Sequence, residues 1–214
     1  MDVYSILKRL MDIFGALVGI IIFSPLLIGG ALWVKIVSPD GPIFADIKPR
    51  VGKNRAPFKF YKFRSMVMNG YEFLKNNYPE LHKKYEENNY KLSADEDPRL
   101  LKGAKFVRHY SIDEMPQFFN VLKGDMSIVG PRAYYFYEVE EQCQRHPEAI
   151  PYMEEALKVK PGITGLWQVS GRSQVGFLDR VKMDAFYAKK RSILYDLLII
   201  LKTPYVVLTG KGAF

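Results

Sequence analysis

An uninterrupted apolar segment at residues 13–34 constrains the fold of this chain more than any other feature of its sequence. The segment reads IFGALVGIIIFSPLLIGGALWV and contains no charged side chain. As a helix it would be about 33 Å long, enough to cross a hydrocarbon core of about 30 Å. It is apolar on every face, unlike the helices of most water-soluble domains, and it is longer than the core of a signal peptide. The sequence therefore predicts a membrane segment.

The middle of this segment is predicted to break. Pro25 lacks the N–H group that a helix needs, and the hydroxyl of Ser24 can satisfy a backbone group that the break frees. Basic residues flank the segment on both sides, and such residues tend to stay in the cytoplasm. A re-entrant helix that bends at the break and returns satisfies both flanks, whereas a straight single span is the alternative. The flanking residues are Lys8 and Arg9 before the segment and Lys35, Lys48, Arg50, Lys53, Arg55, Lys59, Lys62 and Arg64 after it.

The rest of the chain alternates turn signals with short apolar runs, which indicates an α/β fold that is rich in helices and has a small sheet. The apolar stretch at 193–208 is interrupted by charges and follows three basic residues. It fits a helix that lies in the membrane interface, and it fits an ordinary core helix equally well. The other expected elements are a strand at 58–63, a surface helix at 71–91, helices at 135–144 and 177–190, and a loop at 161–165.

Composition limits the kinds of partner. The 214 residues carry 31 basic and 23 acidic side chains, a formal net charge of +8. This excess predicts an anionic partner, which is a nucleic acid, an acidic membrane surface or a phosphorylated substrate. Cys143 is the only cysteine, so an internal disulfide is excluded. The three histidines are scattered and the common nucleotide, zinc and serine-hydrolase motifs are missing, which argues against a zinc site or a hydrolase triad.

The motif SIDEMP at 111–116 carries the clearest chemical signal. Ser111 and Glu114 have the spacing of a capping box, in which each side chain satisfies a backbone donor of the other. Pro116 favours a different interpretation, because proline is comfortable at the start of a helix and not inside one. A helix that begins at Pro116 places Asp113 and Glu114 at its positive end. Two carboxylates there could hold a divalent ion, and one of them could act as a nucleophile.

Two arginines strengthen the chemical interpretation. Arg108 precedes the motif, and Arg132 follows a Gly-Pro turn after the next apolar run. A guanidinium group presents a planar fork that matches phosphate oxygens, although a surface ion pair is the plain alternative for either arginine alone. Carboxylates beside arginines on a membrane-anchored chain indicate phosphoryl chemistry with a metal ion that offsets charge repulsion.

Several motifs, in order along the chain, resemble those of a known family. They are KRLMD at 8–12, SP at 24–25, YKFRSM at 61–66, SIDEMPQ at 111–117, NVLKGDMSIVGPR at 120–132, PGITGLWQVSGR at 161–172 and DAFYA at 184–188. Together they resemble the monotopic phosphoglycosyl transferases, also called bacterial sugar transferases. The resemblance covers nearly the whole chain apart from 67–89, which looks like an insertion. The additional membrane helices of larger members are not seen, so the chain resembles the minimal catalytic unit.

The resemblance implies an activity and a domain division. Residues 1–36 would be the re-entrant membrane-anchoring helix and 37–214 the catalytic domain at the cytosolic face. The enzyme would move a sugar-1-phosphate from a UDP-sugar to polyprenol (undecaprenyl) phosphate, the first membrane step of exopolysaccharide, capsule or O-antigen synthesis. Asp113 would attack the β-phosphorus, release UMP and carry a covalent sugar-phosphoryl group, and a polyprenol phosphate would then accept that group.

The resemblance also assigns residues and partners. Glu114 would be the principal ligand of Mg²⁺, with Asp113 beside it. The segments 134–141 and 209–214 favour galactose or glucose as the sugar. Undecaprenyl phosphate and membrane lipids are the other expected partners, no nucleic acid is expected, and self-association into a homo-oligomer is left open. The expected location is the cytoplasmic face of the bacterial inner membrane, with monotopic insertion. The remaining substrate-binding positions would be Lys62, Arg108, Arg132, Asp184 and Asp196.

Two readings from other classes compete with this one. A basic, aromatic-rich RNA-binding module could use the segment 48–64 for stacking and phosphate contacts, although the apolar segment at 13–34 argues against it. A membrane-anchored scaffold without chemistry would use Asp113 and Glu114 only as a helix cap.

Overall fold

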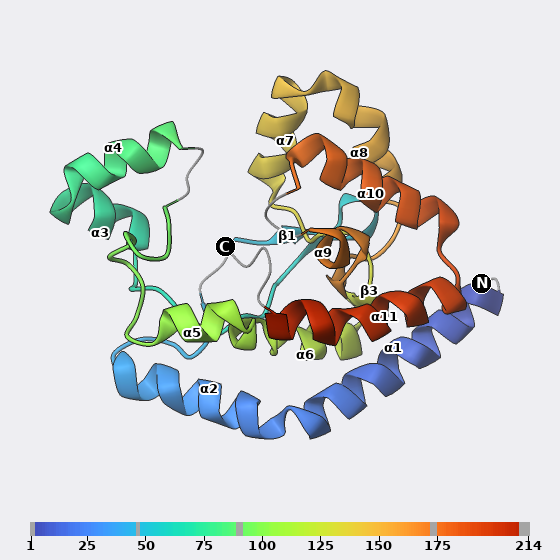
Figure 1. The fold of residues 1–214 in the computed structure, drawn as a ribbon, viewed down its shortest axis with the longest axis horizontal. Helices are drawn as coiled ribbons and strands as arrows, with labels where there is room; N and C mark the ends of the chain where they lie inside the picture. Colours follow the sequence, from blue (N-terminus) through green and yellow to red (C-terminus); the bar gives the residue numbers. More distant parts are fainter. Residues whose placement is uncertain (1–2, 46–47, 89–91, 172–174, 210–214) are drawn as a thin grey trace.

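The computed structural model describes residues 3–45, 48–88, 92–171 and 175–209, and it consists mainly of helices (Figure 1). The segment 210–214, Arg172 and Asn89, which belong to the motifs and the insertion above, lie outside the described residues. The described helices are α1 (Val3–Ile22), α2 (Ser24–Val37), α3 (Gly70–Asn77), α4 (Pro79–Glu87), α5 (Ala104–His109), α6 (Gln117–Lys123), α7 (Phe136–Arg145), α8 (Ile150–Ala156), α9 (Leu166–Ser170), α10 (Phe177–Lys190) and α11 (Ile193–Thr209). Short 3₁₀ turns lie at η1 (Lys53–Arg55), η2 (Ile112–Glu114) and η3 (Pro147–Ala149).

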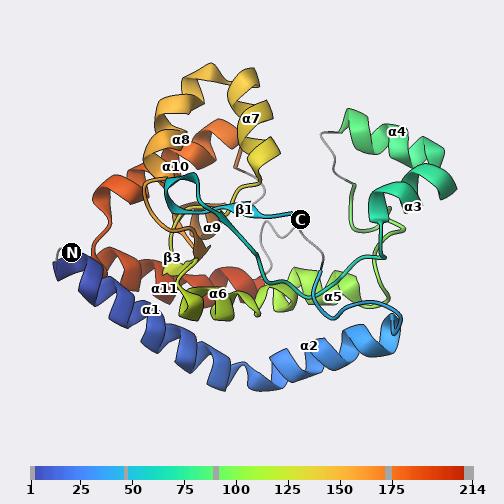
Figure 2. The same ribbon diagram turned by 180° about the vertical axis from the view of Figure 1, so that it is seen from behind.

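The helix-break-helix predicted at the N-terminus is confirmed. Helices α1 and α2 meet at an angle of 63°, and within the described ranges no single helix is long and apolar enough to cross a membrane, whereas this bent pair is. Because Pro25 has no N–H group, the carbonyl of Ile21 loses its helical partner. The hydroxyl of Ser24 donates to that carbonyl oxygen at 2.8 Å, so the residue before the proline repairs the break. Figures 1 and 2 show α1 and α2 as a shallow V along one side of the molecule.

The concave side of this V is anchored to the rest of the protein by polar contacts and close packing. The buried carboxylate of Asp12 accepts hydrogen bonds from the Ser127 hydroxyl at 2.8 Å and the Ile128 amide at 2.9 Å. Arg9 donates two hydrogen bonds of 2.7 Å to carbonyl groups at the end of α6. These contacts fix α6, which begins directly after the SIDEMP motif, against α1.

Two small sheets of two strands each lie within the described chain. Strands β1 (Arg50–Val51) and β2 (Pro57–Phe58) pair antiparallel, and β3 (Ser127–Val129) pairs in parallel with β4 (Gly162–Thr164). The expected loop at 161–165 is therefore wrong, since its middle residues form β4. A Cβ atom at Gly162 would lie 2.1 Å from the backbone nitrogen of Gly130, so this pairing requires glycine.

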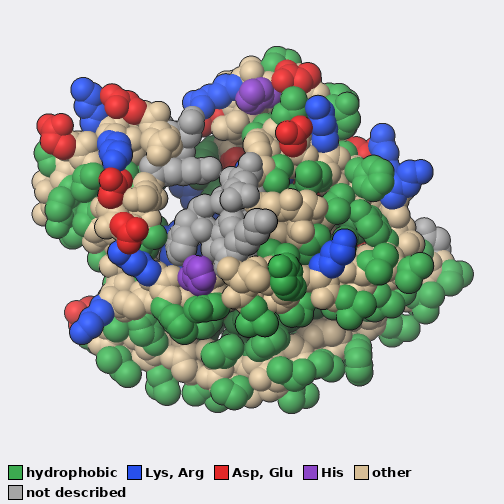
Figure 3. Space-filling model, viewed as in Figure 1, with side chains coloured by type: hydrophobic (Ala, Val, Ile, Leu, Met, Phe, Trp, Pro, Cys, Tyr) green, Lys and Arg blue, Asp and Glu red, His purple; other side chains and the backbone are tan. Residues whose placement is uncertain are grey.

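The other expected helices are mostly confirmed. Helices α7 and α10 match the expected ranges within one residue, whereas the surface helix expected at 71–91 is a hairpin of α3 and α4 that breaks before Pro79. Most of α11 is exposed and apolar, and only Asp196 and Ile199 are buried. Figure 3 shows many apolar side chains on the surface of α1 and α2, and the exposed apolar residues of α11 favour its interfacial interpretation over the core helix. The domain division at residue 36 stays a prediction.

Candidate functional site

The SIDEMP motif does not cap a helix. Ser111 lies in the left-handed region with a φ of 56°, and its side chain makes no capping hydrogen bond. Residues Ile112–Glu114 form the 3₁₀ turn η2, Pro116 occupies the N-cap position of α6, and α6 begins at Gln117, one residue after the predicted start. The capping-box interpretation is therefore wrong, and the two carboxylates lie in the turn that precedes α6.

Lys62 bridges the two carboxylates. Its Nζ atom lies 2.9 Å from Oδ2 of Asp113 and 3.1 Å from Oε1 of Glu114. The Asp113 side chain is only 2% exposed, whereas that of Glu114 is 41% exposed. The two neighbouring acids therefore differ in their access to solvent while they share one cation.

The pKa values of the two acids shift in opposite directions. Burial raises the pKa of Asp113, even though the charges of Lys62 and Arg108 oppose the rise. Burial alone would also raise the pKa of Glu114, but the charge and hydrogen bond of Lys62, the hydrogen bond of Gln117 and the charge of Arg132 together lower it to about 2. Burial lowers the pKa of Lys62 less than the two carboxylates raise it, so the net shift is upward. Glu114 is thus held ionised, and Lys62 is held positively charged.

The expected strand at 58–63 is largely wrong, and its actual path explains how Lys62 reaches the acids. Only Phe58 of this segment lies in a regular strand. The buried side chain of Asn120 accepts a hydrogen bond from the Tyr61 amide at 2.9 Å and donates one to the Lys59 carbonyl at 2.6 Å. The Phe63 amide donates to the carbonyl of Asp113 at 2.8 Å. A side chain of α6 and the turn η2 therefore hold most of this segment, and a single antiparallel bridge between Phe44 and Phe63 adds its only strand-like pairing after Phe58 in the described chain.

Arg132 and Asp184 belong to a second polar cluster on the side of α10. Asp184 is fully buried, and its Oδ2 atom accepts hydrogen bonds from the Tyr134 hydroxyl at 2.8 Å and the Arg132 amide at 3.1 Å. Burial raises the pKa of Asp184 to about 7, although these bonds and the charges of Arg132 and Arg180 oppose the rise. Asp184 thereby positions the segment that carries Arg132.

The guanidinium group of Arg132 lies 5.4 Å from the ring centre of Trp167, and its Nε atom lies 3.5 Å from Glu138. The charge of Arg132 lowers the pKa of Glu114. The charge of Arg108, at the end of α5, lowers the pKa of Asp113 in the same way. In each acid burial acts in the opposite direction and is the larger effect. The structure therefore brings Lys62, Arg108 and Arg132 into the electric field of the two acids, as the sequence predicted.

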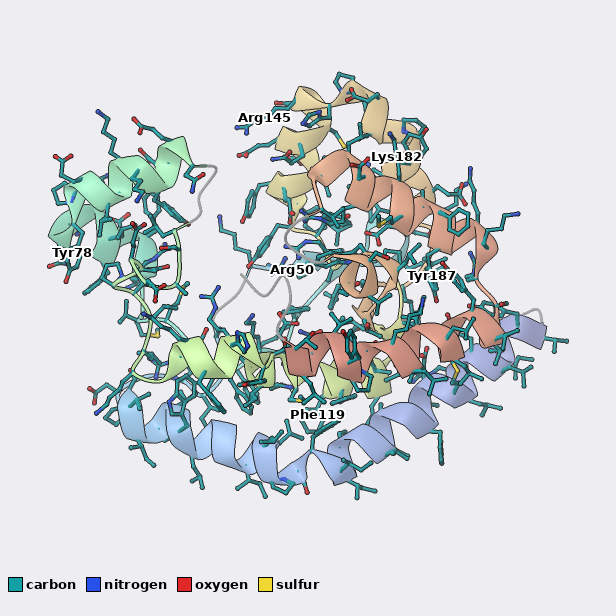
Figure 4. The ribbon with its side chains drawn as sticks, viewed as in Figure 1. Arg50, Tyr78, Phe119, Arg145, Lys182 and Tyr187 are labelled. Atoms are coloured by element: carbon teal, nitrogen blue, oxygen red, sulfur yellow. The ribbon has the colours of Figure 1, made fainter. Side chains whose placement is uncertain are left out.

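Asp196 lies in a different cluster. It is fully buried in α11, where Lys8 of α1 lies 3.1 Å from its Oδ2 atom and the hydroxyl of Tyr187 donates to its Oδ1 atom at 2.6 Å. The same Lys8 also contacts Asp12 at 3.2 Å. These contacts join α1, α10 and α11, and Figure 4 shows Tyr187 where α10 passes over α11. A substrate-binding role for Asp196 stays a prediction, because its partners hold helices together.

Sequence reasoning missed three residues that build the site: Asn120, Tyr134 and Arg50. Arg50 was counted only as one of the basic residues after the membrane segment. It is buried, donates to the carbonyl of Ala133 at 2.9 Å, and lies 3.2 Å from the ring centre of Tyr135. Its ring partners, Phe60 and Tyr135, lie 10 and 85 positions away, so no local signal in the sequence could have found it.

The donor set fits Mg²⁺ bound together with its substrate. Across the described ranges no three side chains of His, Cys, Asp or Glu gather into a ready-made metal cluster. Mg²⁺ usually takes one or two protein carboxylates and completes its shell with phosphate oxygens and water. The ionised, partly exposed carboxylate of Glu114, with Asp113 beside it, meets that requirement.

A buried carboxylate with a lysine bridge and nearby arginines defines a site for phosphate chemistry, and the comparisons agree with this class. The model of the bacterial sugar transferase family matches residues 3–210, so the chain belongs to that family. It is 44% identical over 211 residues to "Undecaprenyl-phosphate galactose phosphotransferase" of Salmonella typhimurium, which covers 97% of this chain and 42% of the relative. The family inferred from the motifs is thus confirmed.

Two further relatives differ in length. "Exopolysaccharide production protein ExoY" of Sinorhizobium fredii is 36% identical, covering 98% of this chain and 89% of the relative. "UDP-glucose:undecaprenyl-phosphate glucose-1-phosphate transferase" of Escherichia coli is 35% identical, covering 99% of this chain and 42% of the relative. The chain therefore spans less than half of the Salmonella and Escherichia relatives and nearly all of the Sinorhizobium relative.

Proposed function

We propose that this chain transfers a sugar-1-phosphate from a UDP-sugar to polyprenol phosphate and releases UMP. The observation that carries the proposal is the carboxylate of Asp113, buried beside Lys62 and within the field of Arg108. A carboxylate removed from water but balanced by cations is a suitable nucleophile for an anionic phosphorus centre. The names of the Salmonella and Escherichia relatives, which both act on undecaprenyl phosphate, support this activity.

In the first step an oxygen of Asp113 attacks the β-phosphorus of the UDP-sugar. The bond between that phosphorus and the oxygen that bridges to the α-phosphate breaks, and UMP leaves with the electron pair. Lys62, Arg108 and Arg132 offset the negative charge that the reacting phosphate carries. The product on the enzyme is a sugar-phosphoryl-aspartate.

In the second step an oxygen of polyprenol phosphate attacks the same phosphorus, and the bond to Asp113 breaks. The carboxylate is restored and polyprenol-diphospho-sugar leaves. Because both substrates are anionic, a covalent intermediate lets one cationic site serve each in turn. Glu114, with Asp113, would hold Mg²⁺, which when bound neutralises phosphate charge and polarises the phosphoryl group.

The sugar is proposed to be galactose or glucose, in line with the names of two relatives. The test measures UMP release by the purified protein with UDP-galactose, UDP-glucose and a panel of other UDP-sugars, in the presence of undecaprenyl phosphate and Mg²⁺. We expect release that requires Mg²⁺ and is fastest with a hexose donor. No release with any donor would overturn the proposal.

The variant Asp113→Asn separates an enzyme from a scaffold. Asparagine keeps the size of the side chain but cannot attack phosphorus, so we expect the rate of UMP release to fall by about 10³-fold or more. Asp95→Asn, a substitution of a 91% exposed acid, is the control and should leave the rate unchanged. Full turnover by Asp113→Asn in a folded protein would favour the non-catalytic scaffold.

We further propose that α1 and α2 dip into the inner membrane of a bacterium and return to the cytoplasmic face. The 63° bend, the exposed apolar residues of both helices and the basic residues at both ends support a re-entrant path. Asp2→Cys and Asp40→Cys, each in a Cys143→Ser background, should both resist an impermeant maleimide added outside intact cells. Labelling of only one of them would refute this path. Release from membranes by salt without detergent would favour the RNA-binding alternative.

A further inference from the structure

A groove of about 430 Å³ opens between the β1–β2 hairpin and the first turn of α7. Its walls combine aromatic rings with one basic and one acidic side chain. None of the residues assigned above to catalysis or to metal binding lines it, so the groove is a separate feature. The lining residues are Lys48, Pro49, Pro57, Tyr135, Phe136, Tyr137 and Glu140.

Two tyrosines in the groove form a stacked platform. The rings of Tyr135 and Tyr137 are stacked, with their centres 5.0 Å apart and an angle of 21° between their planes. The guanidinium carbon of Arg50 lies 3.2 Å from the centre of the Tyr135 ring, which is the inner of the two. Nζ of Lys48 lies 6.0 Å from the centre of the outer ring, that of Tyr137. Tyr137 remains 45% exposed, so the outer ring is accessible to a flat ligand.

Arg50 joins the stacked tyrosines of the groove to the segment that carries Arg132, because it contacts Tyr135 and donates to the carbonyl of Ala133. Figure 4 shows it in the middle of the molecule, near the first turn of α7. Burial lowers its pKa, and its Nη1 atom donates to the carbonyl of Ala133, the residue that follows Arg132, at 2.9 Å. Its Nε atom is buried and has no hydrogen-bond partner in the described part of the chain. A buried guanidinium with an unused donor beside Arg132 suits a phosphate oxygen.

We propose that this groove binds the pyrimidine nucleoside of the nucleotide-sugar, with the base on Tyr137 and the phosphates leading past Arg50 to Asp113. The inference rests on the proposed function, in which the nucleoside and the sugar extend to opposite sides of the reacting phosphorus. Stacked aromatic rings beside cations are typical of sites for bases. The carboxylate of Glu140 can accept a hydrogen bond from the imide N–H of uracil.

The test compares the binding of UMP and ribose 5-phosphate to the purified, Mg²⁺-loaded full chain by titration calorimetry. Tyr137→Leu should weaken UMP binding by about 5- to 150-fold, the range expected for the loss of one base–aromatic stack. Binding of ribose 5-phosphate should not change, and Tyr137→Phe should bind UMP like the natural chain. Tyr152→Leu is the matched control, because Tyr152 is 38% exposed and Nζ of Lys182 lies 6.0 Å from its ring centre.

Three results would overturn the proposal. The first is a natural chain that binds no UMP, and the second is a Tyr137→Leu variant that binds UMP normally. The third is an equal loss of UMP and ribose 5-phosphate binding, which would indicate a general structural effect. A change in preference between UDP-galactose and UDP-glucose with unchanged UMP affinity would assign the groove to the sugar instead. If the natural chain binds UMP through Tyr137 but transfers no sugar-phosphate, the proposed function fails and the nucleoside site stands.

Discussion

Replacing Asp184 by asparagine should remove a strong pH dependence of stability between about pH 4 and pH 7. The folded protein keeps the proton of Asp184 up to a pKa of about 7, whereas an unperturbed aspartate releases it near 3.8. Between these values the folded state binds more protons than the unfolded state, so a rise in pH destabilises the natural protein. The asparagine variant lacks this dependence.

The magnitude follows from the two pKa values. They differ by about 3 units, and each unit corresponds to ~1.36 kcal/mol, so Asp184 costs the natural protein about 4 kcal/mol as the pH rises from about 4 to about 7. Asparagine can still accept from the Tyr134 hydroxyl and the Arg132 amide. Its amide group would take the place of Oδ1, which has no hydrogen-bond partner in the described chain, at a cost of roughly 1–3 kcal/mol that does not vary with pH.

The pH-dependent difference between variant and natural protein is therefore the quantity to measure. Thermal unfolding in detergent, followed by tryptophan fluorescence, gives the melting temperature of both proteins between pH 4 and pH 8. We expect the variant's advantage to grow by on the order of 10 °C between pH 4 and pH 7, since 1 kcal/mol shifts the midpoint by roughly 2–4 °C at this size. Asp179→Asn, on an exposed position of the same helix, is the control. A difference in melting temperature between the Asp184→Asn variant and the natural protein that stays constant over this pH range would refute the reasoning.

Two further predictions concern the catalytic turn and the membrane helix. Lys62→Met should raise the pKa of Glu114 from about 2 toward the ordinary 4.5, because the main opposing charge is lost, and a carbon-13 NMR titration of the carboxyl group should record the shift. If the pKa of Glu114 were unchanged in this variant, the result would contradict the bridge that Lys62 forms between the two acids. Gly19→Ala should lower the melting temperature, since a Cβ atom there would lie 2.5 Å from the ring of Phe118, whereas Gly29→Ala meets nothing within 4 Å and should not. Equal effects of the two substitutions would argue against the packing of α1 on α6.

Features with local causes could be predicted from the sequence. Pro25 breaks the apolar helix because a proline removes one specific hydrogen bond, and the repair by Ser24 involves a carbonyl three residues away. Pro116 places the start of α6 for a similar reason, and with it the turn that carries Asp113 and Glu114. Neither feature depends on a distant part of the chain.

The wrong predictions share a different cause. The segment 58–63 has the composition of a strand, but its Tyr61 amide and its Lys59 carbonyl are paired by the side chain of Asn120, about 60 positions away. The segment 161–165 has the composition of a loop, but β3 lies beside it and supplies a parallel partner. In both cases the backbone hydrogen bonds are decided by which distant segment is the neighbour, and local pattern carries no information about that.

The sequence by itself determined the break in the apolar N-terminal helix, the pair of adjacent carboxylates, the family and the arginines near the site, since periodicity, proline positions and contiguous motifs encode them. Only the tertiary structure decided that Lys62, 52 positions before Glu114, bridges the two acids, and that Asp196 contacts Lys8 of α1. It also brought Arg50 and two tyrosines into one stack. The physical reason is that burial and the choice of charge partners, which set the pKa values and the chemistry here, arise from contacts between segments far apart in the chain.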